Sequence, residues 1–213
     1  MSLKVIQELG DEHVQSELMS RIETWYKELK DILSALPEDL KIYWFAQDDP
    51  GIMKDFGVGG YAYSPQIMSL GFTLDFEDKE DQLKQLKSTV YHEGLHIAQN
   101  YTGTGETTPL IECMIYEGLA TIFEREVLGN HQPYGEYPDD KTVRQWIDDI
   151  SDVKTPWGFA DYAKWGFEDP ESGEKWRLYK AGTWLIDQIL KNTDTTVMNM
   201  TKMTANQILE LHK

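Results

Sequence analysis

Hydrophobic residues recur every three or four positions in several parts of the chain, which is the period of an α-helix with one buried face. Over residues 4–35 this spacing predicts one or two helices that end before Pro37. The same spacing predicts later helices at 80–101, 109–128, 141–151, 174–191 and 204–212. Two runs favour strands instead: a β-branched and aromatic run at 41–46, and an alternating run at 66–76. This order of elements predicts an α+β fold, mostly helical, with a small mixed β-sheet upstream of the helix at 80–101.

Charged and turn-forming residues mark the expected ends of the two central helices. Acidic residues cluster between Asp75 and Asp81, where negative charge complements the N-terminal end of a helix dipole, and Gly103 is expected to end that helix. We interpret the cluster as a helix start and not as a calcium loop, because the glycine and terminal glutamate of such a loop are missing. Thr108 is expected to cap the next helix, with Pro109 in its first position and Gly129 directly after its end.

The chain has 213 residues, enough for one sizeable domain and too few for two full ones. We therefore expect a single domain over 1–213. A helical segment would occupy 1–36, the sheet and the two central helices 40–128, and a second helical part 129–213. Within that last part the stretch 155–173 reads as a loop rich in aromatic residues, which either covers a core or lines a cleft.

The chain is strongly acidic, with a formal net charge of -17. This charge would repel nucleic-acid backbones and anionic membrane surfaces, so we expect neither as a partner. No apolar run has the length of a signal peptide or of a membrane span. A single cysteine, Cys113, allows no intramolecular disulfide and agrees with a reducing compartment. These features predict a cytoplasmic location.

Two histidines and a glutamate form a short motif in the helix predicted at 80–101: His92, Glu93 and His96 in the run His-Glu-Gly-Leu-His. Four residues advance about 400° around a helix, so the two histidines lie one turn apart and can bind one metal ion. Glu93 lies beside them, where a carboxylate can take a proton from a metal-activated water without being a ligand. The spacing indicates zinc-dependent hydrolysis. The open alternative is a helical protein in which the motif is a coincidence.

A catalytic zinc takes three protein ligands and leaves the fourth position to water, so the histidines need a partner elsewhere in the chain. Glu117 is our candidate, because it lies on the next predicted helix, 21 positions after His96, which leaves room for one reversal of the chain. Taken by itself, Glu117 would be interpreted as a solvated helix residue, and it becomes a candidate ligand only together with the motif.

The sequence excludes one other class of zinc enzyme and argues against a second. A metzincin-type site needs glycine at position 99 and histidine at position 102, where this chain has Gln99 and Thr102. A deformylase-like site needs a cysteine ligand upstream of the histidines, but Cys113 lies downstream of them.

The His-Glu-x-x-His helix followed by Glu117-Gly-Leu-Ala on the next helix resembles the gluzincin metallopeptidases, and is also similar to a bacterial family of predicted zinc-dependent proteases. The run Tyr179-Lys-Ala-Gly182 resembles the Tyr-x-x-Gly helix of gluzincin aminopeptidases. The resemblance covers residues 40–192 and implies a zincin-like domain. The chain departs from the pattern at Gly94, a helix-weakening residue inside the motif, and in a slightly longer ligand spacing. It lacks the exopeptidase motif of the aminopeptidases, so exopeptidase action is not implied.

The resemblance implies a mechanism on a peptide or protein substrate. His92, His96 and Glu117 would hold one zinc ion per chain, and Glu93 would act as the general base and then pass the proton to the leaving amine. The hydroxyl of Tyr179 would face the oxyanion. The strand at 67–75 resembles the edge strand along which gluzincins bind an extended peptide.

Several residues near these positions have ordinary structural interpretations that stay open. Tyr179 borders an apolar stripe and is either catalytic or part of the packing, and Gly182 is either part of the motif or a packing notch. Thr121 either hydrogen-bonds a ligand or is an ordinary helix residue. We interpret Cys113 as a small buried residue. The remaining histidines are interpreted as surface residues: His13, His131 and His212.

The leading hypothesis is therefore a zinc-dependent peptidase. The alternative is a catalytically silent interaction or regulatory protein that has kept the zincin fold and its zinc. Both hypotheses predict bound zinc, and only the first predicts cleavage of peptides.

Overall fold

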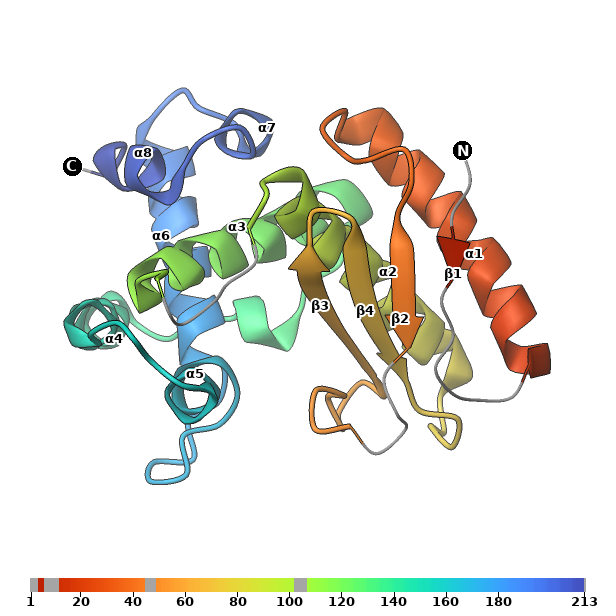
Figure 1. Ribbon diagram of the computed structural model, residues 1–213. Helices are drawn as coiled ribbons and strands as arrows, with labels where there is room; N and C mark the ends of the chain where they lie inside the picture. Colours follow the sequence, from red (N-terminus) through yellow and green to blue (C-terminus); the bar gives the residue numbers. More distant parts are fainter. Residues whose placement is uncertain (1–3, 6–11, 45–48, 102–106, 213) are drawn as a thin grey trace. The chain divides into compact units, whose positions relative to one another are not determined.

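The computed structural model describes residues 4–5, 12–44, 49–101 and 107–212. The chain divides into two units, unit 1 over residues 1–102 and unit 2 over residues 103–213, each with its own set of elements (Figure 1). The single domain expected from the sequence stays a prediction.

Unit 1 contains a four-stranded sheet in the order β1-β2-β4-β3. Its strands are β1 (Lys4–Val5), β2 (Lys41–Trp44), β3 (Val58–Ser64) and β4 (Ile67–Phe72). β2 pairs in parallel with both β1 and β4, whereas β3 and β4 are antiparallel neighbours along the chain. The small mixed sheet upstream of the motif helix is confirmed, and with it the mostly helical α+β class.

Two helices complete unit 1, α1 (Glu12–Ile32) and α2 (Lys79–Ala98). α2 lies against β3 and β4, and α1 packs against α2 (Figure 1). Gly94 is at the contact between the two helices, where a Cβ atom would lie 2.3 Å from Cδ2 of the fully buried Leu29. The glycine inside the metal motif is therefore explained by the close approach of α1.

The structure corrects the expected role of the strand at 67–75. β4 lies inside the sheet between β2 and β3, so the edge strand next to it is β3, which the sequence did not indicate. β4 is also more buried than a half-exposed strand. Its Ser69 is buried and pairs in register with Tyr43 on one side and Tyr61 on the other. Positions 45 and 46 of the first expected strand lie outside the described residues.

Unit 2 is helical in its described part. Its elements are α3 (Leu110–Leu128), the 3₁₀ turn η1 (Pro133–Gly135), α4 (Asp140–Asp152), α5 (Phe159–Gly166), α6 (Arg177–Asn192), α7 (Val197–Met200) and α8 (Ala205–Glu210). The helices expected at 109–128, 141–151, 174–191 and 204–212 are all present, with ends shifted by a few residues. The stretch 155–173 is not wholly a loop, because α5 lies within it.

α3 and α6 form the centre of unit 2 and cross at two glycines. A Cβ atom on Gly118 would lie 2.1 Å from the carbonyl carbon of Gly182, and one on Gly182 would lie 1.9 Å from the carbonyl oxygen of Met114. Only glycine at both positions allows the two backbones to approach this closely. Gly182 therefore serves as a packing notch.

Within the part of the chain that the structure describes, no helix combines the length and the apolar character needed to cross a membrane.

We predict that Gly182→Ala lowers the free energy of unfolding by about 3 kcal/mol, because the added methyl group meets backbone and cannot be relieved by a side-chain rotation. Chemical denaturation followed by circular dichroism measures this change. The matched control is Gly158→Ala, where the nearest atom to the new Cβ is 3.9 Å away, so the expected loss is about 1 kcal/mol or less. Equal losses in the two variants would contradict the proposed helix contact.

Candidate metal centre

The motif helix α2 begins and ends with specific backbone caps. The Asp78 side chain accepts a hydrogen bond from the Asp81 backbone N–H at 3.0 Å, which confirms the acidic helix start. At the other end Asn100 has a positive φ of 55°, its N–H donates to Ile97 O, and the N–H of Tyr101 donates to His96 O. This Schellman arrangement ends the helix before the expected stop at Gly103, which lies outside the described residues.

The two motif histidines lie side by side. Their ring centroids are 4.8 Å apart with an interplanar angle of 84°, and both side chains are buried. The cap places the ring of Tyr101 against His96, with 5.0 Å between centroids. Sequence reasoning missed Tyr101, although an asparagine at the end of a periodic helix was a signal for such a turn. The i, i+4 spacing has therefore brought two imidazoles together, as expected.

Glu93 is buried beside the edge strand β3. A Cβ atom on Gly60 of β3 would lie 2.4 Å from Cγ2 of Thr89 and 2.8 Å from Cγ of Glu93. The missing side chain at Gly60 thus lets the strand backbone lie directly against the predicted general base.

Glu117 is buried on α3, one residue before the helix crossing at Gly118. The N-cap of this helix is Pro109 and not the expected Thr108, whereas Gly129 has the left-handed conformation expected after its end, with φ of 66°. The Thr121 hydroxyl donates to the backbone carbonyl of Glu117 at 2.8 Å. Thr121 therefore forms a hydrogen bond with the backbone of the candidate ligand and not with its carboxylate.

A hydroxyl chain connects Glu117 with Tyr179 in unit 2. The Tyr162 hydroxyl donates to Oε1 of Glu117 at 3.2 Å, and the hydroxyl oxygens of Tyr162 and Tyr179 are 3.2 Å apart. Tyr162 comes from α5, within the stretch expected to be an aromatic loop. Sequence reasoning found the aromatic cluster that includes Tyr162 but not its contact with Glu117, because a short segment distant in sequence carries no spacing signal toward Glu117.

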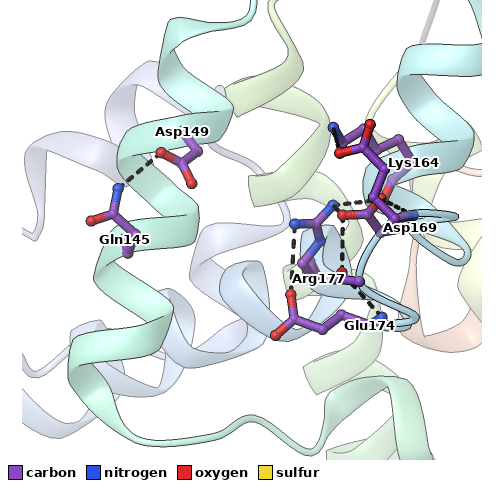
Figure 2. Close-up of polar contacts among 8 residues, drawn as sticks. Gln145, Asp149, Lys164, Asp169, Glu174 and Arg177 are labelled. Atoms are coloured by element: carbon purple, nitrogen blue, oxygen red, sulfur yellow. Dashed lines mark hydrogen bonds and ion pairs between the residues drawn. The ribbon is translucent and has the colours of Figure 1, made fainter.

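A buried ion pair holds together the segment that connects α5 and α6. Nη2 of Arg177 lies 2.8 Å from Oδ2 of Asp169 and donates to the Lys164 carbonyl at 3.1 Å (Figure 2). The guanidinium also stacks 4.1 Å from the ring centroid of Trp165. Through these contacts the end of α5 is held against the start of α6, which positions the segments that carry Tyr162 and Tyr179.

The structure thus brings the predicted site residues together in two groups. His92, Glu93 and His96 are neighbours on α2 in unit 1, and Glu117 and Tyr179 are joined through Tyr162 in unit 2. His131 and His212 are exposed, and Cys113 is buried, as expected. The side chain of His13 lies outside the described residues.

Residues 13–210 match the model of a family described as "Predicted Zn-dependent protease (DUF2268)". The chain belongs to this family. A search of curated proteins and a search of solved structures each found no match. Membership in a zinc-dependent protease family confirms zinc as the cofactor and implies peptide or protein substrates.

The residues present are chemically suited to the zinc of this family. His92, His96 and Glu117 are all buried, and each offers one atom that can bind a metal ion. Two imidazole nitrogens and one carboxylate oxygen are a donor set typical of catalytic zinc.

The pKa of Asp169 lies below its usual value, because its carboxylate accepts the Glu171 backbone N–H, then the Ser172 hydroxyl, and faces the Arg177 charge. The folded protein therefore binds this proton less tightly than the unfolded chain. The resulting stabilisation is present above about pH 4 and is lost as the pH falls through the lowered pKa.

We predict that Asp169→Asn lowers the free energy of unfolding at neutral pH, and that this deficit shrinks below about pH 4. Urea denaturation across a pH series measures it. The control Asp149→Asn removes the same charge from an exposed helix position, where Asp149 accepts from Gln145 (Figure 2), and should show a small effect. A deficit that persists unchanged in acid would contradict the ion pair.

Proposed function

We propose that this protein is a gluzincin-type zinc peptidase in which His92, His96 and Glu117 bind one zinc ion and Glu93 is the general base. The observation that carries the proposal is the pair of adjacent imidazole rings on α2, with Glu93 on the same helix and next to β3. Family membership and the burial of all three donors support it. A cytoplasmic location stays a prediction from the sequence.

A zinc ion held by His92, His96 and Glu117 would supply Lewis acidity for a peptide carbonyl and would lower the pKa of a water molecule. Glu93 accepts the proton of that water and later passes it to the leaving amine. Glu93 suits both steps because its side chain is buried and held against Gly60, so its position is defined by packing on two elements. A general base needs this fixed position within hydrogen-bond reach of the reacting water.

The substrate edge in this proposal is β3, in place of the strand at 67–75. Among the described strands β3 pairs only with β4, and the bridge between Met53 and Val58 lies at its start. An extended peptide that pairs with β3 beyond Gly59 would pass Gly60, where an added Cβ atom would lie 2.8 Å from Cγ of Glu93. Tyr61 and Tyr63 are exposed on this strand and offer aromatic surface to the peptide.

Tyr179 is proposed to stabilise the oxyanion with its hydroxyl. Its support is the hydroxyl chain to Glu117, which places the phenol near a candidate zinc ligand. The helix crossing at Gly118 and Gly182 supports the same placement, because Tyr179 lies one turn before Gly182.

We predict that Glu93→Gln keeps the zinc and lowers kcat by about 10²–10⁴-fold, because the amide cannot accept the proton. The measurements are elemental analysis of the purified protein and cleavage of a broad peptide library. Glu112→Gln, in the first turn of α3, is the matched control and should leave both readouts unchanged.

His92→Ala and Glu117→Gln are expected to lower the zinc content, because each removes one of three ligands. A wild-type protein without zinc, or zinc content unaffected by both variants, would contradict the proposed ligands. Bound zinc without cleavage of any library peptide would contradict the peptidase and support the catalytically silent alternative.

A further inference from the structure

We propose that Tyr162 is a positioning residue of the zinc site: its hydroxyl orients the carboxylate of Glu117 and accepts the hydrogen bond of Tyr179. The inference rests on the proposed function, because it assigns a role to the residue that contacts the proposed carboxylate ligand. Neither the motif nor the family resemblance indicates this tyrosine.

The direction of the hydrogen bonds follows from a count of protons. An ionised carboxylate only accepts hydrogen bonds, so the single proton of Tyr162 is donated to Oε1 of Glu117. In the contact between the two phenols the donor is then Tyr179, and the acceptor is the oxygen of Tyr162. Tyr162 thus uses its one donor on the ligand and offers a lone pair to Tyr179.

This arrangement has two consequences for the site. The bond to Oε1 restrains the rotation of the Glu117 carboxylate, so the orientation of this candidate ligand is defined. The bond from Tyr179 holds that phenol on Tyr162 until another acceptor, such as the substrate oxygen, competes for its proton.

Aromatic packing holds the ring of Tyr162 on several sides. Trp157 stacks on it with 5.9 Å between centroids and an angle of 23°, and Phe167 meets it edge-on at 5.8 Å. Trp157 is itself tied to the chain before α3, because its Nε1–H donates to the Thr108 carbonyl at 2.7 Å. Gly166 lies so close that a Cβ atom there would be 2.9 Å from Cε1 of Tyr162.

Because these contacts involve the ring, Tyr162→Phe removes the hydroxyl and leaves the packing intact. The matched control is Tyr137→Phe. Tyr137 donates to Asp187 at 2.9 Å, another tyrosine-carboxylate bond of unit 2, and burial and this bond raise its pKa to about 12, so it is a neutral donor. Asp187 belongs to the ion pair with Arg125 and is not a proposed ligand.

The experiment measures zinc affinity by competition with a chromophoric chelator in wild type, Tyr162→Phe, Tyr137→Phe and Glu117→Gln. We expect Tyr162→Phe to weaken zinc binding by about 10- to 100-fold, and Tyr137→Phe to leave it within about 2-fold of wild type. Thermal unfolding of the metal-free proteins should show similar small losses for the two phenylalanine variants, since each removes one hydrogen bond to a carboxylate.

Cobalt substitution supplies a second readout that a merely structural role would not move. The visible absorption of bound Co²⁺ reports its ligand geometry, so the spectrum should change in Tyr162→Phe and match wild type in Tyr137→Phe. Wild-type affinity and spectrum in Tyr162→Phe, with zinc binding lost in Glu117→Gln, would overturn the inference and leave the proposed function standing. Unchanged zinc binding in Glu117→Gln would overturn both.

Discussion

The contact between the backbones of α3 and α6 at Gly118 and Gly182 is the constraint on which unit 2 depends. A methyl group at either position would overlap backbone atoms of the other helix. Glu117 is adjacent to Gly118, and Tyr179 lies one turn before Gly182, so the crossing brings both side chains within reach of the Tyr162 hydroxyl. The hydrogen-bonded chain from Glu117 to Tyr179 therefore depends on glycine at positions 118 and 182.

Glycines have a similar effect around α2 in unit 1. Gly94 admits Leu29 of α1, and Gly60 admits the backbone of β3 against Thr89 and Glu93. A glycine weakens a helix by about 1 kcal/mol relative to alanine, and here close packing offsets that cost. Glu93 is buried at the place where β3 approaches the helix through Gly60.

The errors of the sequence reasoning have common physical causes. β3 contains consecutive glycines, which are disfavoured in strands and obscure the alternation of polar and apolar residues, so no strand was expected there. α5 has only 8 residues, too few for a clear helical period among so many aromatic side chains. The edge position of the strand at 67–75 came from the resemblance to gluzincins, and the local pattern could not test it, because it does not show that β4 pairs with both β2 and β3.

The sequence by itself determined the long helices, in which the hydrophobic period is repeated over many residues. It also determined that the two motif histidines are neighbours, because the i, i+4 spacing is a property of the helix alone. It also identified Glu117 and Tyr179 as candidates through their local runs. Only the tertiary structure decided that β3 forms the sheet edge beside Glu93, that Tyr101 packs on His96, and that Tyr162 reaches Glu117. The last contact joins residues 45 positions apart, and a hydrogen bond between distant segments leaves no periodic trace in the sequence.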